Sequence, residues 1–399
     1  MSTHSYPLGG YGPQRRSAWS KITTRGSVAW RLDWLLLLAA TALSCLGGVL
    51  IYSATRNRTE INQGDPYYFL YRHAFSFAVG LVLMAVTVWL GHRRLRGAVP
   101  VLYGLSLLLT LLVLTPLGAT INGQRAWIQL GAGFSLQPAE LTKISVILGM
   151  AMLLAARVDA GDREYPDHRT VLQALAMAAA PIAVILMMPD LGSVMVLVLI
   201  VLGVLLASGA SNRWVVGLVT AGAGGAVLVW ALGVLDEYQI NRFAAFANPA
   251  LDPSGVGYNT NQARIAIGSG GLTGKGLFEG TQTTGQFVPE QQTDFIFSVA
   301  GEELGFVGGG LIIALMGVVL WRACRIARET TELYGTIVAS GVIAWLAFQT
   351  FENIGMTLGI MPVAGLPLPF VSFGGTSMFA TWIAIGLLQS IKVQRPVSA

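Results

Sequence analysis

The segment WLLLLAATALSCLGGVLIYSA, residues 34–54, contains no charged side chain. A helix needs roughly 17–25 mostly apolar residues to cross the hydrocarbon core of a membrane, so this segment is long enough to span one. Runs of the same kind occur near residues 74–91, 98–117, 139–156, 171–188, 191–210, 214–234, 305–321, 334–355 and 374–391. The sequence therefore predicts an all-α polytopic membrane protein with about ten transmembrane helices.

The composition of the whole chain agrees with this fold class. Of the 399 residues, 54% are hydrophobic and 11% are charged, and the mean hydropathy is +0.62. Because soluble proteins carry about a quarter charged residues, the composition excludes a water-soluble enzyme. The net charge of +5 is too small to indicate a nucleic-acid partner. The two cysteines, Cys45 and Cys324, make neither a disulfide framework nor a metal site.

The distribution of Lys and Arg predicts the orientation of the chain. Residues 1–32 are polar, basic and rich in Gly, Pro and Ser, which indicates a disordered tail. If this tail, the alternate short loops and the C-terminus are cytosolic, that side holds 17 of the 25 Lys and Arg side chains, in agreement with the positive-inside rule. We therefore expect a multi-pass protein of the cytoplasmic membrane, surrounded by membrane lipids. It would have a membrane domain at 33–393 and cytosolic residues 394–399.

The longest loop lies between the seventh and eighth predicted helices, at about residues 235–304, and is expected to be extracytoplasmic. Loops of this length in a compact protein tend to be functional. The remaining connections on this outer side are shorter, and those on the cytosolic side are mostly under 15 residues. We therefore expect any catalytic surface to lie on the outer face.

Asp294 is the sharpest candidate for catalysis. It stands in PEQQTDFIF, residues 289–297, among aromatic and aliphatic side chains at the end of the longest loop. If residues 294–304 are helical, Asp294, Ser298 and Glu302 share one face of the helix. Partial burial of a carboxylate raises its pKa toward that of a useful general base. The alternative is that Asp294 simply begins a helix.

Three further ionisable residues lie at membrane depth, where they are costly. Glu140 and Lys143 open the fourth predicted helix at i, i+3 spacing, so they are either an internal ion pair or the lining of a polar cavity. Asp190 stands where the chain turns between the fifth and sixth helices. It either caps the next helix or lies at the outer mouth of a groove.

Several cations lie on the outer side, against the positive-inside trend. Cations of this kind neutralise a phosphate or pyrophosphate, or else anchor the chain to lipid headgroups. The candidates for such phosphate binding are Arg125, Lys143, Arg242, Arg264 and Lys275. The Gly-rich run at 268–276 does not match the P-loop pattern, because Ser269 and Gly276 stand where that pattern needs Gly and Ser or Thr.

Four sequence blocks resemble the shape, elongation, division and sporulation (SEDS) family of glycosyltransferases, which includes RodA and FtsW. The blocks are GFSLQPAELTK at 133–143, PDLGS at 189–193, TDFIF at 293–297 followed by GEELG at 301–305, and LPLPFVSFGGTS at 366–377. The resemblance covers roughly residues 33–393. The sequences at 353–356 and 367–369 are more similar to RodA than to FtsW.

The resemblance implies polymerisation of lipid II into glycan strands on the outer membrane face, with Asp294 as the essential catalytic acidic residue. It also implies pairing with a class B penicillin-binding protein, the transpeptidase. Glu302 and Ser372, which lie in the third and fourth blocks, are further candidates for binding the pyrophosphate or sugar of the substrate. A divalent cation, Mg²⁺ or Mn²⁺, would help to neutralise the pyrophosphate, although the sequence shows no dedicated set of metal ligands. Gln291-Gln292 departs from the family, in which many members carry a His before Thr-Asp.

Two other functions fit ten helices with charges at membrane depth. A transporter or flippase for the lipid-linked precursor would use Asp190 or Glu140 as its coupling residue. It should show inverted internal repeats with interrupted helices in both halves, whereas the sequence has one clear interruption, at 189–190. A non-catalytic scaffold would tolerate substitution of Asp294. We favour the glycosyltransferase over both.

Overall fold

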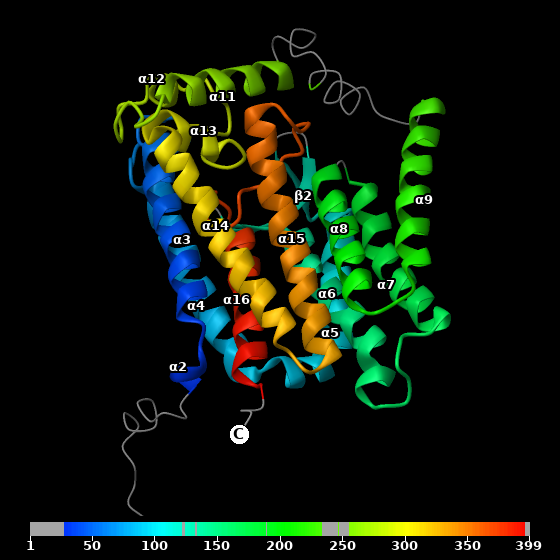
Figure 1. Cartoon of the computed structure of the whole chain (residues 1–399). Helices are drawn as coiled ribbons and strands as arrows, with labels where there is room; N and C mark the ends of the chain where they lie inside the picture. Colours follow the sequence, from blue (N-terminus) through cyan, green and yellow to red (C-terminus); the bar gives the residue numbers. More distant parts are fainter. Residues whose placement is uncertain are drawn as a thin grey trace, which may run out of the picture.

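The computed structural model describes residues 28–121, 124–131, 134–188, 190–233, 246 and 255–395, and each predicted span coincides with a helix (Figure 1). The helices are α3 (Trp34–Thr55), α4 (Tyr68–Leu90), α5 (His92–Val113), α6 (Pro138–Asp159), α7 (His168–Leu186), α8 (Leu191–Ala207), α9 (Asn212–Ala231), α14 (Gly305–Arg328), α15 (Leu333–Leu358) and α16 (Gly375–Val393). In the described part of the chain, eight helices are long and apolar enough to cross a membrane. These eight do not include α8 and α9, so the count of ten crossings stays a prediction.

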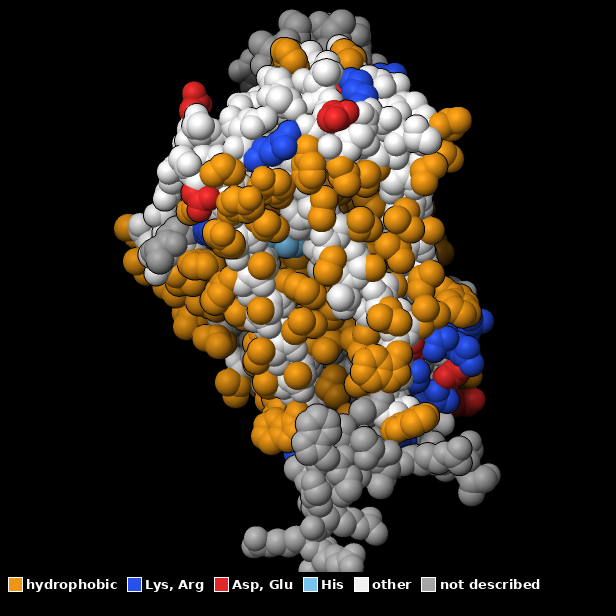
Figure 2. Space-filling view, turned by 90° about the vertical axis from the view of Figure 1, so that its left-hand side faces the viewer, with side chains coloured by type: hydrophobic (Ala, Val, Ile, Leu, Met, Phe, Trp, Pro, Cys, Tyr) orange, Lys and Arg blue, Asp and Glu red, His pale blue; other side chains and the backbone are white. Residues whose placement is uncertain are grey.

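Three helices form the centre of the bundle. In the most apolar window of each, 83% of α16, 67% of α6 and 61% of α15 is buried, against 22% of α4 and of α5. The outer helices expose apolar side chains such as Trp89, Val101 and Phe306. Figure 2 shows a broad band of hydrophobic side chains across the middle of one face, with charged side chains above and below it. This distribution is the one expected of helices packed together within a lipid bilayer.

Local sequence signals explain where several helices begin. The side chains of Asp33, Asp167 and Asp190 accept hydrogen bonds from backbone N–H groups three residues further on, and so cap α3, α7 and α8. Pro138 stands in the first turn of α6, where its missing N–H is not needed. The predicted break between α7 and α8 is therefore present, and Asp190 is its helix cap.

Two connections at one end of the bundle contain structure that the sequence analysis treated as loop. Residues 118–136 include a three-stranded antiparallel sheet in the order β1 (Gly118–Ile121), β2 (Gln124–Gly131) and β3 (Phe134–Leu136). The described part of the predicted long loop contains α11 (Val256–Gly270), α12 (Thr281–Thr284) and α13 (Ile296–Glu303). We call this end of the bundle the site end. There α11, α12 and α13 form a cap over the bundle (Figure 1).

The opposite end carries both ends of the described chain, and we call it the terminal end. A short helix, α2 (Val28–Arg31), lies within the predicted tail, and Arg31 donates a hydrogen bond to the carbonyl oxygen of Arg395. Residues 1–27, the rest of that tail, lie outside the described residues. The shared position of both ends agrees with an even number of crossings, although it does not say which side of the membrane they face.

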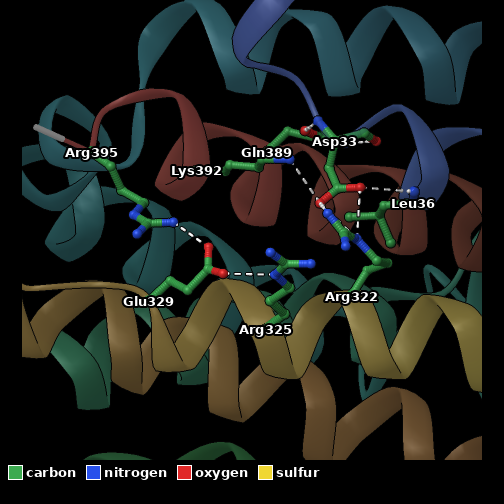
Figure 3. Close-up of polar contacts among 8 residues, drawn as sticks. All are labelled: Asp33, Leu36, Arg322, Arg325, Glu329, Gln389, Lys392 and Arg395. Carbon is green, nitrogen blue, oxygen red and sulfur yellow. Dashed lines mark hydrogen bonds and ion pairs between the residues drawn. The ribbon is translucent and has the colours of Figure 1, made fainter. Parts of the chain in front are cut away.

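An ion network closes the terminal end (Figure 3). The Asp33 carboxylate is 1% exposed, and it accepts hydrogen bonds from Arg322 at 2.6 and 3.0 Å and from Lys392 at 2.9 Å. Gln389 donates to the carbonyl oxygen of Asp33 and accepts from its N–H group. A single carboxylate thus ties the start of α3 to α14 and α16.

Candidate active site

The candidate site lies around the Ala364–Pro367 segment, which belongs to the connection between α15 and α16. From α15, Asn353 donates a hydrogen bond to the carbonyl oxygen of Leu366 at 2.7 Å, and Gln349 donates to that of Pro367 at 2.8 Å. Gly192 of α8 approaches so closely that a Cβ there would lie 2.5 Å from the carbonyl oxygen of Ala364. The segment is therefore held between α8 and α15.

Asp294 lies beside this segment, in a turn that precedes α13. The Asn353 side chain, which binds Leu366, also donates to the carbonyl oxygen of Asp294 at 2.8 Å. A Cβ built on Gly365 would lie 3.6 Å from Oδ2 of Asp294. Asp294 is half-buried. The backbone of Asp294 is thus held in place, the residue is half-buried, and Gly365 lies beside its carboxylate.

The shared face of Asp294, Ser298 and Glu302 was predicted on the condition that residues 294–304 are helical, and the structure does not meet that condition. The helix begins only at Ile296, because the N–H of Phe295 bonds to the carbonyl oxygen of Glu290 and closes a turn there. The Ser298 hydroxyl donates back to the backbone of Phe295. Asp294 is therefore outside the helix that carries Glu302.

Glu302 has a structural environment. Its side chain is fully buried and accepts hydrogen bonds from Lys275 at 2.9 Å, from the N–H groups of Gln282 and Thr283 at 2.8 Å, and from the Thr283 hydroxyl at 2.9 Å. Burial acts to raise the pKa of Glu302, but the hydrogen bonds from Lys275 and the two N–H groups outweigh it and hold the pKa below its usual value. Glu302 thus pins α12 and Lys275 to α13.

Asp190 joins three helix starts at the site end. Besides capping α8 through Ser193, its Oδ2 atom lies 3.4 Å from the Nε2 donor of Gln137. Gln137 is the residue before α6, and its N–H donates to the hydroxyl of Thr376 in α16 at 3.1 Å. The capping interpretation of Asp190 is thereby confirmed. The positive ends of the α6, α8 and α16 dipoles meet here.

Glu140 and Lys143 form the internal ion pair that was one of their two predicted roles. Nζ of Lys143 lies 2.6 Å from Oε1 of Glu140, and both side chains are at most 1% exposed. The same ammonium donates to Oε1 of Gln349 at 3.0 Å and lies 5.3 Å from the centre of the Trp345 ring. Because Gln349 also donates a hydrogen bond to the carbonyl oxygen of Pro367, the ion pair is linked through Gln349 to the Ala364–Pro367 segment.

The other cations predicted to bind phosphate differ in whether they already have hydrogen-bond or ion-pair partners. Arg125 donates to the carbonyl oxygen of Thr115, after the end of α5, and Lys275 is paired with Glu302. Arg264 is exposed on α11, and the structure assigns it no hydrogen bond or ion pair within the described residues. Arg242 lies outside the described residues.

Arg264 is near Asp294 through its neighbours. Ala263 packs with Phe295, the residue after Asp294, and a Cβ on Gly359 at the end of α15 would lie 3.2 Å from Cδ of Arg264. Arg264 is thus an exposed cation that follows directly after Ala263, the residue that packs with Phe295.

Ser372 and the two glutamines before Thr293 have structural contacts. The Ser372 hydroxyl accepts from the N–H of Leu368 at 2.8 Å and closes a turn after the Ala364–Pro367 segment. Gln291 donates to the carbonyl oxygens of Ala54 and Thr283, and Gln292 accepts from Arg58 at 3.4 Å. The glutamines that replace the family's His region therefore fasten the Asp294 turn to the end of α3.

The sequence analysis missed Gln124, which the first strand pairing brings to the site. Only Asn122 and Gly123 separate β1 from β2 in sequence, and Asn-Gly between two apolar runs is the strongest short-range signal of a hairpin. A Cβ on Gly365 would lie 3.8 Å from Nε2 of Gln124. The hairpin signal was available, but its relation to Gly365 depends on the tertiary fold.

The described residues contain no obvious metal-binding cluster. No group of three or more His, Cys, Asp or Glu side chains is placed there to hold a metal ion. A pyrophosphate-bound Mg²⁺ or Mn²⁺ needs fewer protein ligands than that, because Mg²⁺ typically keeps waters and binds one or two carboxylates plus substrate phosphates. The predicted divalent cation therefore stays a prediction.

Comparison with known proteins identifies the family. The family model described as "Cell cycle protein" (FtsW, RodA, SpoVE) matches residues 33–396. The chain is 34% identical to a probable peptidoglycan glycosyltransferase FtsW of Geobacter metallireducens, over 91% of this chain and 95% of that protein. It is also 34% identical to the peptidoglycan glycosyltransferase MrdB of Escherichia coli, over 96% and 97%.

A similar solved structure gives the same result. A chain of a peptidoglycan synthase complex that coordinates polymerization and crosslinking matches with a TM-score of 0.73 and 32% identity, over 90% of this chain and 97% of that one. Because the two relatives above are equally similar, the RodA-like assignment within the family stays a prediction. The fold, the sequence blocks and these matches agree that the chain is a multi-pass membrane protein that belongs to the FtsW/RodA/SpoVE family, the SEDS family.

Proposed function

We propose that this protein is a peptidoglycan glycosyltransferase that polymerises lipid II into glycan strands. The observation that carries the proposal is the placement of Asp294, which is half-buried, fixed through its backbone by Asn353, and next to Gly365. Support also comes from relatives named as peptidoglycan glycosyltransferases that match this chain over almost its whole length.

In the proposed reaction, the oxygen of an acceptor sugar hydroxyl attacks the anomeric carbon of a lipid-linked sugar. The new glycosidic C–O bond forms as the C–O bond to the lipid pyrophosphate breaks. The hydroxyl proton passes to the Asp294 carboxylate, which acts as general base. Pyrophosphate leaves as an anion, so a second carboxylic acid is not needed to protonate it, unlike in glycoside hydrolysis.

Positive charge stabilises the departing pyrophosphate. Arg264 is the exposed candidate for this role, and the helix starts of α6, α8 and α16 add the positive ends of their dipoles. A divalent cation, Mg²⁺ or Mn²⁺, would add positive charge that stabilises the departing pyrophosphate. Arg242 remains a further candidate for this function.

The proposal extends to location and partner. The site end would face outward from the cytoplasmic membrane and the terminal end would face the cytosol, because 17 of 25 Lys and Arg side chains then lie inside. The partner would be a class B penicillin-binding protein that crosslinks the new strands. The structural neighbour, which is part of a peptidoglycan synthase complex, supports such a pairing.

Labelled lipid II tests the proposal. Purified wild-type protein, with and without its candidate transpeptidase, is compared with Asp294→Asn and with Asp65→Asn. Asp65 is an exposed carboxylate in the α3–α4 connection, at the same end of the molecule, so it controls for loss of one negative charge. We expect polymer from wild type and Asp65→Asn and at least a hundredfold less from Asp294→Asn, within the range that general bases typically contribute.

Two results would contradict this proposal. Equal polymer from Asp294→Asn and wild type would leave the activity in place but remove Asp294 as base. If wild type makes no polymer with or without the partner but moves labelled lipid between leaflets, the protein is a precursor flippase instead.

A further inference from the structure

Gln124 is the first residue of β2, and the strand directs its side chain toward the candidate site. Gln124 is 8% exposed and Ala126, two residues on, is 3% exposed. Arg125, between them, turns the other way and donates to Thr115. The register of β2 against β1 shifts at Ala126, so it is the burial of Gln124 and Ala126 that places both on the inner face of the sheet.

Gln124 and Asp294 both lie beside Gly365. A Cβ built on Gly365 would be 3.8 Å from Nε2 of Gln124 and 3.6 Å from Oδ2 of Asp294, which is van der Waals contact with both. Gly365 also has a φ of +70°, a conformation that L side chains rarely adopt. The amide and the carboxylate thus border one space, which a side chain at position 365 would enter.

The Gln124 amide makes no hydrogen bond to any other described residue. Polar side-chain groups in the interior of native proteins generally have a protein, water or ligand partner. Because this amide borders the space beside the proposed base, a bound substrate is a suitable partner.

We propose that Gln124 binds the acceptor sugar and positions its hydroxyl against Asp294. An amide is neutral and offers both a donor and an acceptor, so it matches a sugar hydroxyl or acylamino group rather than a pyrophosphate, which needs cations. The neutral sugar then lies between Gln124 and Asp294, whereas the pyrophosphate lies toward Arg264. This inference rests on the proposed glycosyltransferase function.

The test compares matched glutamines on one strand. Gln129 is an exposed residue of β2, so Gln129→Leu and Gln129→Glu control for the same changes at Gln124. Gln124→Leu keeps a similar volume without hydrogen bonds, and Gln124→Glu keeps the shape but loses the N–H donors. We expect either Gln124 variant to raise the KM for lipid II about tenfold, equal to 1.4 kcal/mol, with a smaller change in kcat. Both Gln129 variants should resemble wild type.

A binding measurement separates substrate contact from turnover. In the Asp294→Asn background, adding Gln124→Leu or Gln124→Glu should raise the Kd for lipid II about tenfold. The melting temperature in detergent confirms folding, and Gln124→Glu serves if Gln124→Leu does not fold. If wild type polymerises lipid II while both folded Gln124 variants keep wild-type KM and Kd, the inference is overturned and the proposed function stands. If wild type polymerises nothing, the proposed function fails and the inference fails with it.

Discussion

Asp33 and Asp294 lie at opposite ends of the helix bundle, and their surroundings are opposite too. α3 has 22 residues, so it separates the two ends by roughly 33 Å. Asp33 is 1% exposed, and its carboxylate accepts hydrogen bonds from Arg322, Lys392 and the N–H of Leu36 (Figure 3). Asp294 is half-buried, is held through its backbone, and has a glycine beside its carboxylate.

The difference shows that burial alone does not distinguish a catalytic carboxylate from a structural one. Asp33, Asp190 and Glu302 are all more buried than Asp294, and their hydrogen bonds join helices to one another. Such hydrogen bonds stabilise a carboxylate as an anion, which lowers its capacity to accept a proton. Space beside the carboxylate, here at Gly365, is the feature that a general base needs.

The largest expected effect on stability comes from breaking the ion pair beneath the site. Lys143→Met leaves Glu140 buried without its cation, which typically costs about 3–5 kcal/mol, and we expect a large fall in melting temperature in detergent. The double variant Glu140→Leu/Lys143→Met should recover part of this loss. An unchanged melting temperature in Lys143→Met would show that the pair contributes nothing to the support of the Ala364–Pro367 segment.

The next effect tests how tightly α8 holds that segment. Gly192→Ala places a Cβ 2.5 Å from the carbonyl oxygen of Ala364, so we expect a loss of about 1–3 kcal/mol from overpacking and reduced polymerisation. The control is Gly217→Ala in α9, where no atom lies within 4 Å of the new Cβ. That change should be neutral or slightly stabilising, because Ala favours a helix more than Gly. Equal effects of the two substitutions would contradict the close packing at Gly192.

A smaller effect is expected from substitution of Arg264. It tests whether this side chain binds the pyrophosphate. Arg264→Gln should weaken lipid II binding at least tenfold, since a hydrogen bond to a charged group contributes about 1.5–3 kcal/mol. Lys275→Gln is the comparison, because Lys275 is already paired with Glu302. Its effect should appear in stability rather than in Kd. The assignment of Arg264 fails if its variant binds lipid II as wild type does.

The smallest effect concerns pH and the structural carboxylate Glu302. Its folded pKa lies below the ordinary value of 4.5, so it stabilises the folded state fully above about pH 4.5. That contribution is lost as pH falls through the folded pKa. Melting temperatures of wild type and Glu302→Gln should therefore differ at pH 7 and converge in strong acid. A difference that grows as the pH falls below 4.5 would contradict the assigned environment.

Much of the fold was predictable because the apolar runs that form the helices are local features of the sequence. Each predicted span is a helix, and the i, i+3 pair of Glu140 and Lys143 forms as its spacing allows. The sheet was not predicted, although Asn122-Gly123 is a hairpin signal. Its strands are short, and the length of apolar runs does not reveal short strands.

The arrangement of the site depends on contacts far apart in sequence. Asp294 was predicted from its odd position among apolar residues, but its relation to Asn353, Gly365 and Gln124 involves residues separated by 59 or more positions. No local pattern encodes such a meeting. The same holds for Asp33, whose partners lie 289 and 359 residues away.

The most direct test of the account compares Asp33→Asn with Asp294→Asn in two measurements, the melting temperature in detergent and the rate of lipid II polymerisation per folded molecule. We predict that Asp294→Asn keeps the melting temperature and loses at least a hundredfold in rate, whereas Asp33→Asn lowers the melting temperature and keeps the rate. The account is contradicted if Asp294→Asn polymerises at the wild-type rate, or if Asp33→Asn abolishes polymerisation while remaining as stable as wild type.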